Sequence, residues 1–252
     1  MTTTRNVKSN SRQFWVYVGA AAVLVYSLSP FLWIAIASIT PEIKDYGTLS
    51  GRRVNYFPTH PTLDNYVDLF TNNPFVLYFR NSTIIATGNM LLTLVVASLG
   101  AYAFVRFRFA GRSSLLIAML VAYTIPSVVL LLLINYFSTL PRELDEQAQV
   151  DGCTRLGALW RIVLPLSIPG LVAGGLLAFI MTWNNFLFAF LFTTTNNVKT
   201  LPVMMRLFAM GEPAVWGTSA AGAVLTTLPV ALIFLLFQRM LMSGLAAGAV
   251  KG

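Results

Sequence analysis

The sequence predicts an all-α, polytopic membrane protein, and three observations lead to this fold class. Only 10% of the 252 residues are charged and 56% are hydrophobic, whereas soluble domains carry about 25% charged residues. The mean hydropathy is +0.71. The chain also contains five uncharged runs: 13–41, 81–105, 113–141, 162–198 and 213–238. Each run exceeds the ~20 residues that an α-helix needs to cross the hydrocarbon core of a bilayer.

The composition excludes several kinds of chemistry. With one histidine and one cysteine, the chain cannot form an internal disulfide or a zinc site built from these residue types. The net charge of +8 would also suit a nucleic-acid partner, but the basic residues lie at the ends of the apolar runs. The positive-inside rule places such residues in cytoplasmic loops. We therefore expect a lipid bilayer as partner, no metal and no nucleic acid.

The N-terminal part predicts a membrane anchor. Residues 1–13 are expected to be cytosolic, and the first span is expected over 14–39, with Pro30 kinking it. Three basic residues precede the apolar run, as in a signal peptide. The run is too long for one, however, and lacks a small-residue cleavage site, so the sequence indicates a retained signal anchor.

The next segment predicts a loop on the opposite side of the membrane. Residues 40–80 are rich in proline and charge, and the pattern over 62–70 favours a short amphipathic surface helix. A second span, at about 82–105, begins the core domain, which extends over 81–252. It ends at a cluster of three arginines within 106–112, which the positive-inside rule places in the cytosol.

The third apolar run raises a question of topology. As one helix, 113–141 would extend about 43 Å, enough for one crossing of the membrane but not for two. Five crossings would leave 9 basic residues outside and 8 inside, whereas an additional crossing between Pro126 and Tyr136 gives 6 outside and 11 inside. The second distribution favours six spans with both termini cytosolic, and suggests that a segment is missing near 126–136. A five-span protein is the alternative.

The segment 141–165 is charge-rich and has a helical pattern. Pro141 suits a first helical turn, and three acidic residues follow it near the positive end of the helix dipole. An apolar stripe is expected from Leu144, Ala148 and Val150.

A glycine is expected to divide this segment into two helices. Gly152 can end the first helix in a left-handed conformation, and a second helix is predicted over about 154–163, before Pro165. Such a helix–turn–helix knob has a shape suited to docking into a groove of a partner. An ordinary solvated amphipathic loop is the alternative.

These residues carry a family resemblance. Glu146-Gln-Ala-Gln-Val-Asp-Gly152, followed by Ile162-Val-Leu-Pro165, resembles the EAA loop of permease subunits of binding-protein-dependent ABC importers. Further stretches resemble the carbohydrate branch, in particular the second permease of maltose-type systems: Arg80-Asn-Ser82, Ala101-Tyr-Ala-Phe-Val-Arg-Phe-Arg-Phe-Ala-Gly111, Leu140-Pro-Arg-Glu-Leu, Trp183-Asn-Asn-Phe186 and Gly248-Ala-Val-Lys-Gly252. The sequence departs from the family in that Gln147 replaces the first alanine of the motif, and the third and fourth spans are compressed into one run.

The resemblance implies an assembly. It implies a six-helix permease core that pairs with a second permease as a heterodimer, in the cytoplasmic or inner membrane of a prokaryote. Two ATPase subunits and an extracytoplasmic sugar-binding protein would complete the sugar importer. The chain has no phosphate-cradling glycine loop, so we expect a non-catalytic subunit without a cofactor, with ATP and Mg bound by the ATPase subunits.

The resemblance also implies residue roles. The coupling (EAA) loop would be 141–165, and 239–252 would be a cytosolic C-terminal tail. Contact with the ATPase subunit is implied for the following residues, the last two of which close the loop: Glu146, Ala148, Asp151, Gly152, Leu164 and Pro165.

A second candidate site lies in the fourth apolar run. Trp183, Asn184, Asn185 and Phe186 are expected in the middle of an apolar helix, where polar side chains are costly and usually face the bundle interior or a wet cavity. Two amides and an indole can hydrogen-bond and stack on a sugar, so these residues are candidates for the substrate path. The alternative is interhelical hydrogen bonding, worth about 0.6 kcal/mol on average.

Other functions fit the sequence less well. The same machinery importing a polyol or a glycerol phosphate ester is the nearest alternative. A channel would need a repeated filter or a charged span, and an intramembrane hydrolase would need a nucleophile and a base at membrane depth. The five apolar runs contain no Asp, Glu, His or Lys.

Overall fold

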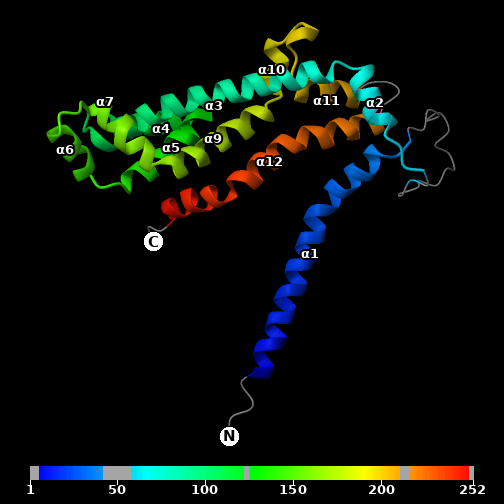
Figure 1. The fold of residues 1–252 in the computed structure, drawn as a ribbon, viewed down its shortest axis with the longest axis horizontal. Coiled ribbons are helices and arrows are strands. Elements are labelled where there is room, and N and C mark those ends of the chain that lie inside the picture. Colours follow the sequence, from blue (N-terminus) through cyan, green and yellow to red (C-terminus); the bar gives the residue numbers. More distant parts are fainter. Residues whose placement is uncertain (1–5, 42–57, 59, 122–124, 211–215, 250–252) are drawn as a thin grey trace. The chain divides into compact units, whose positions relative to one another are not determined.

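Regular structure in the described residues is helical throughout, which confirms the all-α class (Figure 1). The structure, a computed structural model, describes residues 6–41, 58, 60–121, 125–210 and 216–249. The elements are α1 (Asn6–Ser38), α2 (Asp64–Thr71), α3 (Phe75–Arg106), α4 (Arg112–Val121), α5 (Ile125–Ser138), α6 (Glu143–Val150), α7 (Arg155–Ala158), the π-helical η2 (Leu159–Val163), α8 (Leu164–Leu166), α9 (Ile168–Trp183), α10 (Leu187–Phe192), the 3₁₀ turn η3 (Asn196–Val198), α11 (Leu201–Met210) and α12 (Trp216–Ala249).

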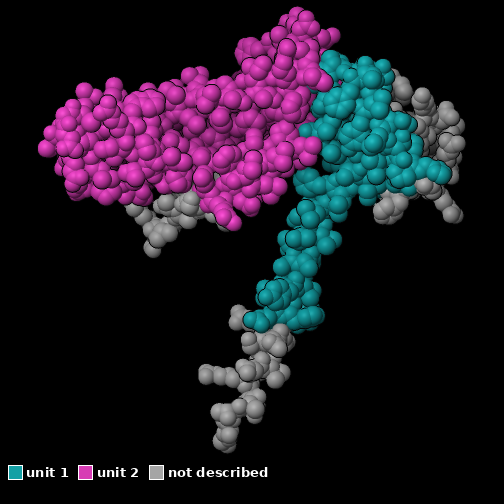
Figure 2. Space-filling view, in the orientation of Figure 1, with its two compact units in different colours: residues 1–75, 205–225 teal, residues 76–204, 226–252 magenta. Residues whose placement is uncertain are grey.

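The chain divides into two compact units, which Figure 2 shows in different colours. Residues 1–75 and 205–225 form the first unit, and residues 76–204 and 226–252 form the second. Both candidate sites lie in the second unit.

In the first unit, α2 is attached to the end of α1. Asn65 donates hydrogen bonds to the carbonyls of Ser38 and Thr40, at 2.9 and 2.8 Å. Leu69, one turn further along α2, is fully buried. The short amphipathic helix predicted over 62–70 is therefore confirmed.

The polytopic prediction is confirmed by helix length and hydropathy. Among the described residues, three helices are long and apolar enough to cross a membrane: Gln13–Ser38, Phe75–Arg106 and Trp216–Met240. A pair of segments bent by 84°, Arg155–Leu166 and Ile168–Trp183, gives a fourth if it is one span. The described residues therefore do not contain six full-length spans, and the reason lies in the third apolar run.

The run 113–141 folds as two short helices. Helices of ten and fourteen residues, α4 and α5, extend only about 15 and 21 Å, less than the ~30 Å hydrocarbon core. The expectation of a missing span at 126–136 predicted a break in the backbone. That break is absent, because α5 passes through these residues without interruption.

The two short helices form a hairpin that returns to its starting point. The guanidinium of Arg106, the last residue of α3, donates to the carbonyls of Leu140 and Pro141, at 3.4 Å each. The chain between residues 106 and 140 therefore begins and ends at the same end of α3. The arginine cluster and the segment 141–165 therefore lie at the same end of α3, and the charge distribution likewise favours one side of the membrane for both. Two half-length helices join them in place of two full crossings.

Two expected boundaries shift. Helix α3 begins at Phe75, directly after Pro74, and so includes the last residues of the expected loop 40–80. Helix α12 continues to Ala249, so most of the expected tail 239–252 is helical.

Close helix packing holds the core of the second unit. A Cβ atom added to Gly170 of α9 would lie 2.7 Å from the ring of Tyr136, and one added to Gly174 would lie 2.9 Å from Val129. Both neighbours belong to α5, where Val129, Leu133 and Phe137 are almost completely buried. Small residues thus let α9 and α5 approach closely, as in many membrane proteins.

Candidate functional site

The knob, defined as residues 141–167, is built around Gly152. Helix α6 ends at Val150, and Gly152 has a φ of +86°, so the predicted left-handed glycine is confirmed. The amide of Cys153 donates to the carbonyl of Ala148 at 2.9 Å, and the amide of Gly152 donates to that of Gln149 at 3.1 Å. This pair of hydrogen bonds is a Schellman motif, which fixes how the chain leaves α6.

The second half of the knob is also helical, as predicted over 154–163. Thr154 caps α7, because its hydroxyl oxygen accepts a hydrogen bond from the amide of Gly157 at 3.1 Å. The π-helical turn η2 and the short α8 continue the helix to Leu166. Such π-helical turns are often found at functional sites.

The structure separates the six expected contact residues into two groups. Glu146, Asp151, Gly152 and Pro165 are exposed. Ala148 is buried, and Leu164 packs partly buried against the core. The first group can touch a partner, whereas the second group shapes the knob from within.

The inward face of α6 differs from the predicted apolar stripe. Val150 is 88% exposed, so its place in the stripe is wrong. The inward face is formed by Asp145 and Ala148, which lie three residues apart and therefore on one side of the helix. On the outward surface of the knob, Val150 is joined by exposed Leu156 and Trp160.

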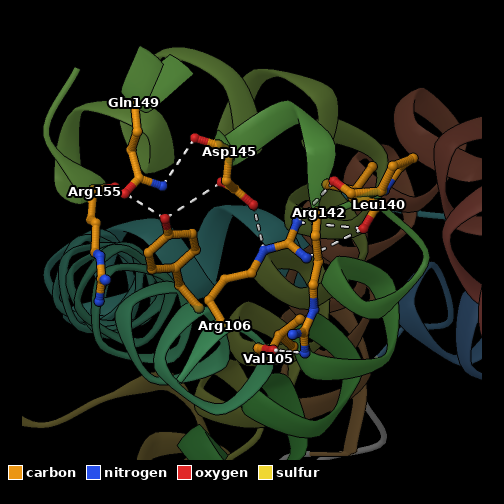
Figure 3. Close-up of polar contacts among 9 residues, drawn as sticks. Val105, Arg106, Leu140, Arg142, Asp145, Gln149 and Arg155 are labelled. Atoms are coloured by element: carbon orange, nitrogen blue, oxygen red, sulfur yellow. Dashed lines mark hydrogen bonds and ion pairs between the residues drawn. The ribbon is translucent and has the colours of Figure 1, made fainter. Parts of the chain in front are cut away.

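A buried ion pair holds the knob on α3 (Figure 3). The Nε of Arg106 lies 2.5 Å from Oδ2 of Asp145, and both side chains are less than a tenth exposed. The hydroxyl of Tyr102, one turn before Arg106, lies 3.4 Å from the other carboxylate oxygen and 3.1 Å from the carbonyl of Arg155. The side chains of α3 thus contact both helices that flank Gly152.

Further contacts join the same segments. Arg142 donates to the carbonyl of Val105 at 3.2 Å, near the end of α3 (Figure 3). The guanidinium of Arg155 lies 5.1 Å from the centre of the Phe107 ring, a cation–π distance.

The sequence interpretation missed Arg106, Tyr102 and Asp145. A local signal existed for Asp145, because it lies three residues before the small residue Ala148, on the face where the helix packs. Its partner is 39 residues away in the sequence, a separation that helical periodicity does not report.

The second candidate site lies at a break between helices and not within one. Helix α9 ends at Trp183 and α10 begins at Leu187, so the expected mid-helix position of the motif is wrong. Asn184 donates to the carbonyl of Ile180 at 2.9 Å, and the side-chain oxygen of Asn185 accepts from the amide of Phe188 at 3.1 Å. Asparagine favours such capping positions over helix interiors, which explains the break.

Trp183 joins several helices. Its side chain is 2% exposed, and its indole nitrogen donates to the carbonyl of Thr226 in α12 at 3.2 Å. Its ring stacks on Phe179, at 5.5 Å between ring centres, and meets Phe79 of α3 edge to face. This residue fits the interhelical hydrogen bonding that was the alternative to a substrate contact.

A cavity of about 330 Å³ lies beside the break. Trp183 and Asn185 line it, whereas Asn184 and Phe186 do not. The hydroxyl of Thr200, which also lines the cavity, is buried and has no hydrogen-bond partner among the described residues. The remaining lining comes from Ser82, Ile85, Asn89, Thr182, Phe188, Ala189, Phe192 and Thr193.

The chain matches a family of transport proteins over most of its length. Residues 21–246 match the family described as "Binding-protein-dependent transport system inner membrane component". The trehalose/maltose transport system permease protein MalG of Thermococcus litoralis is 36% identical, with 96% of this chain and 98% of that protein covered. The sulfoquinovosyl glycerol transport system permease protein SmoH of Agrobacterium fabrum is 33% identical, with 94% and 93% covered.

Solved structures share the fold. A chain of a bacterial ABC transporter involved in the import of the acidic polysaccharide alginate superposes with a TM-score of 0.79. The two chains are 19% identical, and 94% of this chain and 99% of that one are covered. At this identity the likeness shows the fold alone.

The relatives contain residues that this chain lacks. The alignment with SmoH has 270 positions, and 94% of the 252 residues here is about 237, so about 33 positions hold no residue of this chain. This agrees with the expectation that a segment is absent relative to the family.

Proposed function

Because the chain belongs to the family of binding-protein-dependent transport system inner membrane components, we propose that its knob couples a sugar importer to ATPase subunits in the cytosol. The chain is a permease subunit of a sugar ABC importer. We infer that it is a non-catalytic subunit and that partner subunits hydrolyse ATP. The observation that supports the coupling role is the shape of the knob. It presents Glu146, Asp151 and Gly152 outward on a turn whose backbone is fixed by hydrogen bonds.

The charge distribution supports a cytosolic knob. The contact between Arg106 and Leu140 brings the arginine-rich residues 106–112 to the same end of the second unit as Arg142, Arg155 and Arg161. The positive-inside rule assigns such a concentration of arginine to the cytosol. We infer that both chain termini are cytosolic as well.

The exposed surface of the knob suits a protein partner. It combines the apolar side chains of Val150, Leu156 and Trp160 with the carboxylates of Glu146 and Asp151. Apolar anchors in a polar rim are typical of protein interfaces. The ATPase subunit would therefore offer an apolar cleft with basic residues at its edge, and would itself bind ATP and Mg.

The complete importer would contain further partners. A second permease would form a heterodimer with this chain, two ATPase subunits would lie in the cytosol, and an extracytoplasmic binding protein would deliver the sugar. One solved neighbour, with a TM-score of 0.62, is described as an alginate transporter in complex with a periplasmic protein that holds an alginate pentasaccharide.

We propose the cavity beside Trp183 and Asn185 as a part of the sugar path. It combines an indole, amides and hydroxyls, the groups that stack on sugar rings and hydrogen-bond to sugar hydroxyls. Asn184 and Phe186 lie outside its lining, and the buried Trp183 is already engaged by neighbouring helices, so we place the sugar contact on Asn185 and Thr200. Relatives named for trehalose/maltose and diacetylchitobiose transport favour a di- or oligosaccharide over a monosaccharide, a polyol or a glycerol phosphate ester.

Affinity purification tests the assembly. A tagged form of this chain, extracted in mild detergent from cells that contain the other subunits of the importer, should retain an ATPase subunit and a second permease. A channel would be purified without the ATPase. A thermal-shift panel on the purified binding protein, with maltose, trehalose and sulfoquinovosyl glycerol as probes, identifies the solute.

A further inference from the structure

Helix α3 contacts the knob through its last two turns and lines the cavity with residues nearer its start, and this connection suggests how movement is transmitted. We propose that Arg106, Tyr102 and Asp145 are positioning residues that fix the knob to α3, so that a displacement of the knob moves the helix that lines the cavity. The proposal rests on the proposed function, because it requires the knob to be the coupling element.

The ion pair is the shortest of these contacts. Arg106 and Asp145 are 2.5 Å apart and both side chains are almost completely buried, so little solvent screens them. The remaining nitrogens of Arg106 bond to the carbonyls of Leu140 and Pro141. The guanidinium therefore holds the start of the knob at its backbone and at Asp145 at the same time.

Tyr102 extends the attachment to the second helix of the knob. A tyrosine hydroxyl has one hydrogen, so it can donate either to the carboxylate of Asp145 or to the carbonyl of Arg155. Asp145 lies in α6 and Arg155 begins α7, on the two sides of Gly152. The hydroxyl thus lies between the two helices at one point on α3, within hydrogen-bond distance of both, and donates to one of them at a time.

The orientation of the pair also agrees with the helix dipoles. Asp145 lies in the first turn of α6, where a negative charge is favourable. Arg106 lies in the last turn of α3, where a positive charge is favourable. The interaction therefore joins the end of one helix to the start of another.

The opposite part of α3 lines the cavity. Ser82 and Asn89 belong to its lining, and Ser82 is 24 residues, or about 36 Å, from Arg106 along a continuous helix. Asn89 donates to the hydroxyl of Thr182 at 2.6 Å, and the hydroxyl of Ser82 accepts from the amide of Leu201 at 2.9 Å. A rigid helix fixed at both ends is a means by which coupling travels between distant sites.

The test uses ATP hydrolysis by the purified whole complex, so it needs no knowledge of the sugar. The variants are Asp145→Asn, Asp145→Glu and Tyr102→Phe, with Arg108→Gln as the matched control, because Arg108 is exposed and two residues from Arg106. Two quantities are measured: the amount of ATPase subunit retained per chain, and kcat and KM for Mg–ATP.

The positioning role predicts that kcat changes in the variants whereas the amount of retained ATPase subunit does not. All variants should retain the ATPase subunit, because the outward surface of the knob is unchanged. Asp145→Asn should lower kcat by about fivefold or more with an unchanged KM, since coupling free energies of this size are common. Asp145→Glu keeps the carboxylate and should recover most of kcat, Tyr102→Phe should lower kcat, and Arg108→Gln should match the wild type.

Several results would overturn the proposal. The first is that Asp145→Asn has the same kcat per assembled complex as the wild type. The second is that the kcat of Asp145→Glu is no higher than that of Asp145→Asn. If Asp145→Asn does not assemble, Tyr102→Phe decides, since it removes a single hydroxyl: a wild-type kcat then contradicts the role. A wild-type chain that retains no ATPase subunit would instead contradict the proposed function, and the positioning role with it.

Discussion

The guanidinium of Arg106 is hydrogen-bonded to the carbonyl of Leu140, 34 residues further along the chain, at 3.4 Å. This contact closes the hairpin of α4 and α5 at its open end. The contact shows that the chain returns to the end of α3 from which it started. The sequence of the run 113–141 leaves this open, because its length fits one crossing of the membrane whereas the distribution of basic residues favours two.

Labelling of single cysteines tests this topology. In a Cys153→Ser background, Arg108→Cys and Thr154→Cys should react with a membrane-impermeant maleimide only from the cytosolic side. Asn197→Cys should react only from the outside. Asn81 bonds to the carbonyl of Asn197 and lies 25 residues, or about 37 Å, before Arg106 along α3, so residue 197 lies at the end of α3 opposite to the arginine cluster. Labelling of residues 108 and 154 from opposite sides would show that the hairpin is wrong.

Gly152→Val tests the turn of the knob. No atom lies within 4 Å of a Cβ added at this position, so the effect comes from the backbone alone. A β-branched residue at a φ of +86° should cost about 1–3 kcal/mol, and transport should fall while the chain still inserts. Gly152→Asn is the control, since asparagine tolerates the left-handed region. Equal uptake by the two variants would argue against a need for the turn.

Gly170→Ala tests the packing of α9 on α5. The new methyl group would lie 2.7 Å from the Tyr136 ring, and overpacking of this kind costs about 1–3 kcal/mol. We expect a lower melting temperature of the purified complex. Gly88→Ala is the matched control in another helix, because no atom lies within 4 Å of its added Cβ. A melting temperature of Gly170→Ala that is no lower than that of the control would contradict the close packing.

Asn185→Leu and Asn184→Leu separate the sugar path from helix capping. Each variant loses one capping hydrogen bond, worth about 0.5–1.5 kcal/mol, so their losses of stability should be similar. Only Asn185 lines the cavity. Uptake per assembled complex should therefore fall in Asn185→Leu and stay normal in Asn184→Leu. Normal uptake in both would leave the motif as a helix break without a role in the path.

The sequence was sufficient wherever the signal was local. The all-α class, the helix at 64–71 and the left-handed Gly152 follow from hydropathy, helical periodicity and the conformational freedom of glycine. These features depend on residues within one or two helical turns of each other.

The features that were missed depend on contacts or on a competition between local preferences. The pairing of Arg106 with Asp145 requires two distant segments to meet, and no periodic pattern records it. The break at Asn184 and Asn185 was hidden because the surrounding run is apolar enough for a continuous helix. The capping preference of two adjacent asparagines prevailed there over hydropathy.

Photo-crosslinking in the membrane tests the coupling role of the knob most directly. p-Benzoylphenylalanine replaces Glu146 or Asp151, both exposed on the knob, and separately replaces Phe192, which is 79% exposed but lies in α10 beside the cavity. The coupling role predicts that the probes at 146 and 151 crosslink to an ATPase subunit and that the probe at 192 does not. Absence of an ATPase adduct from both knob positions, in a complex that retains the ATPase subunit, would contradict it.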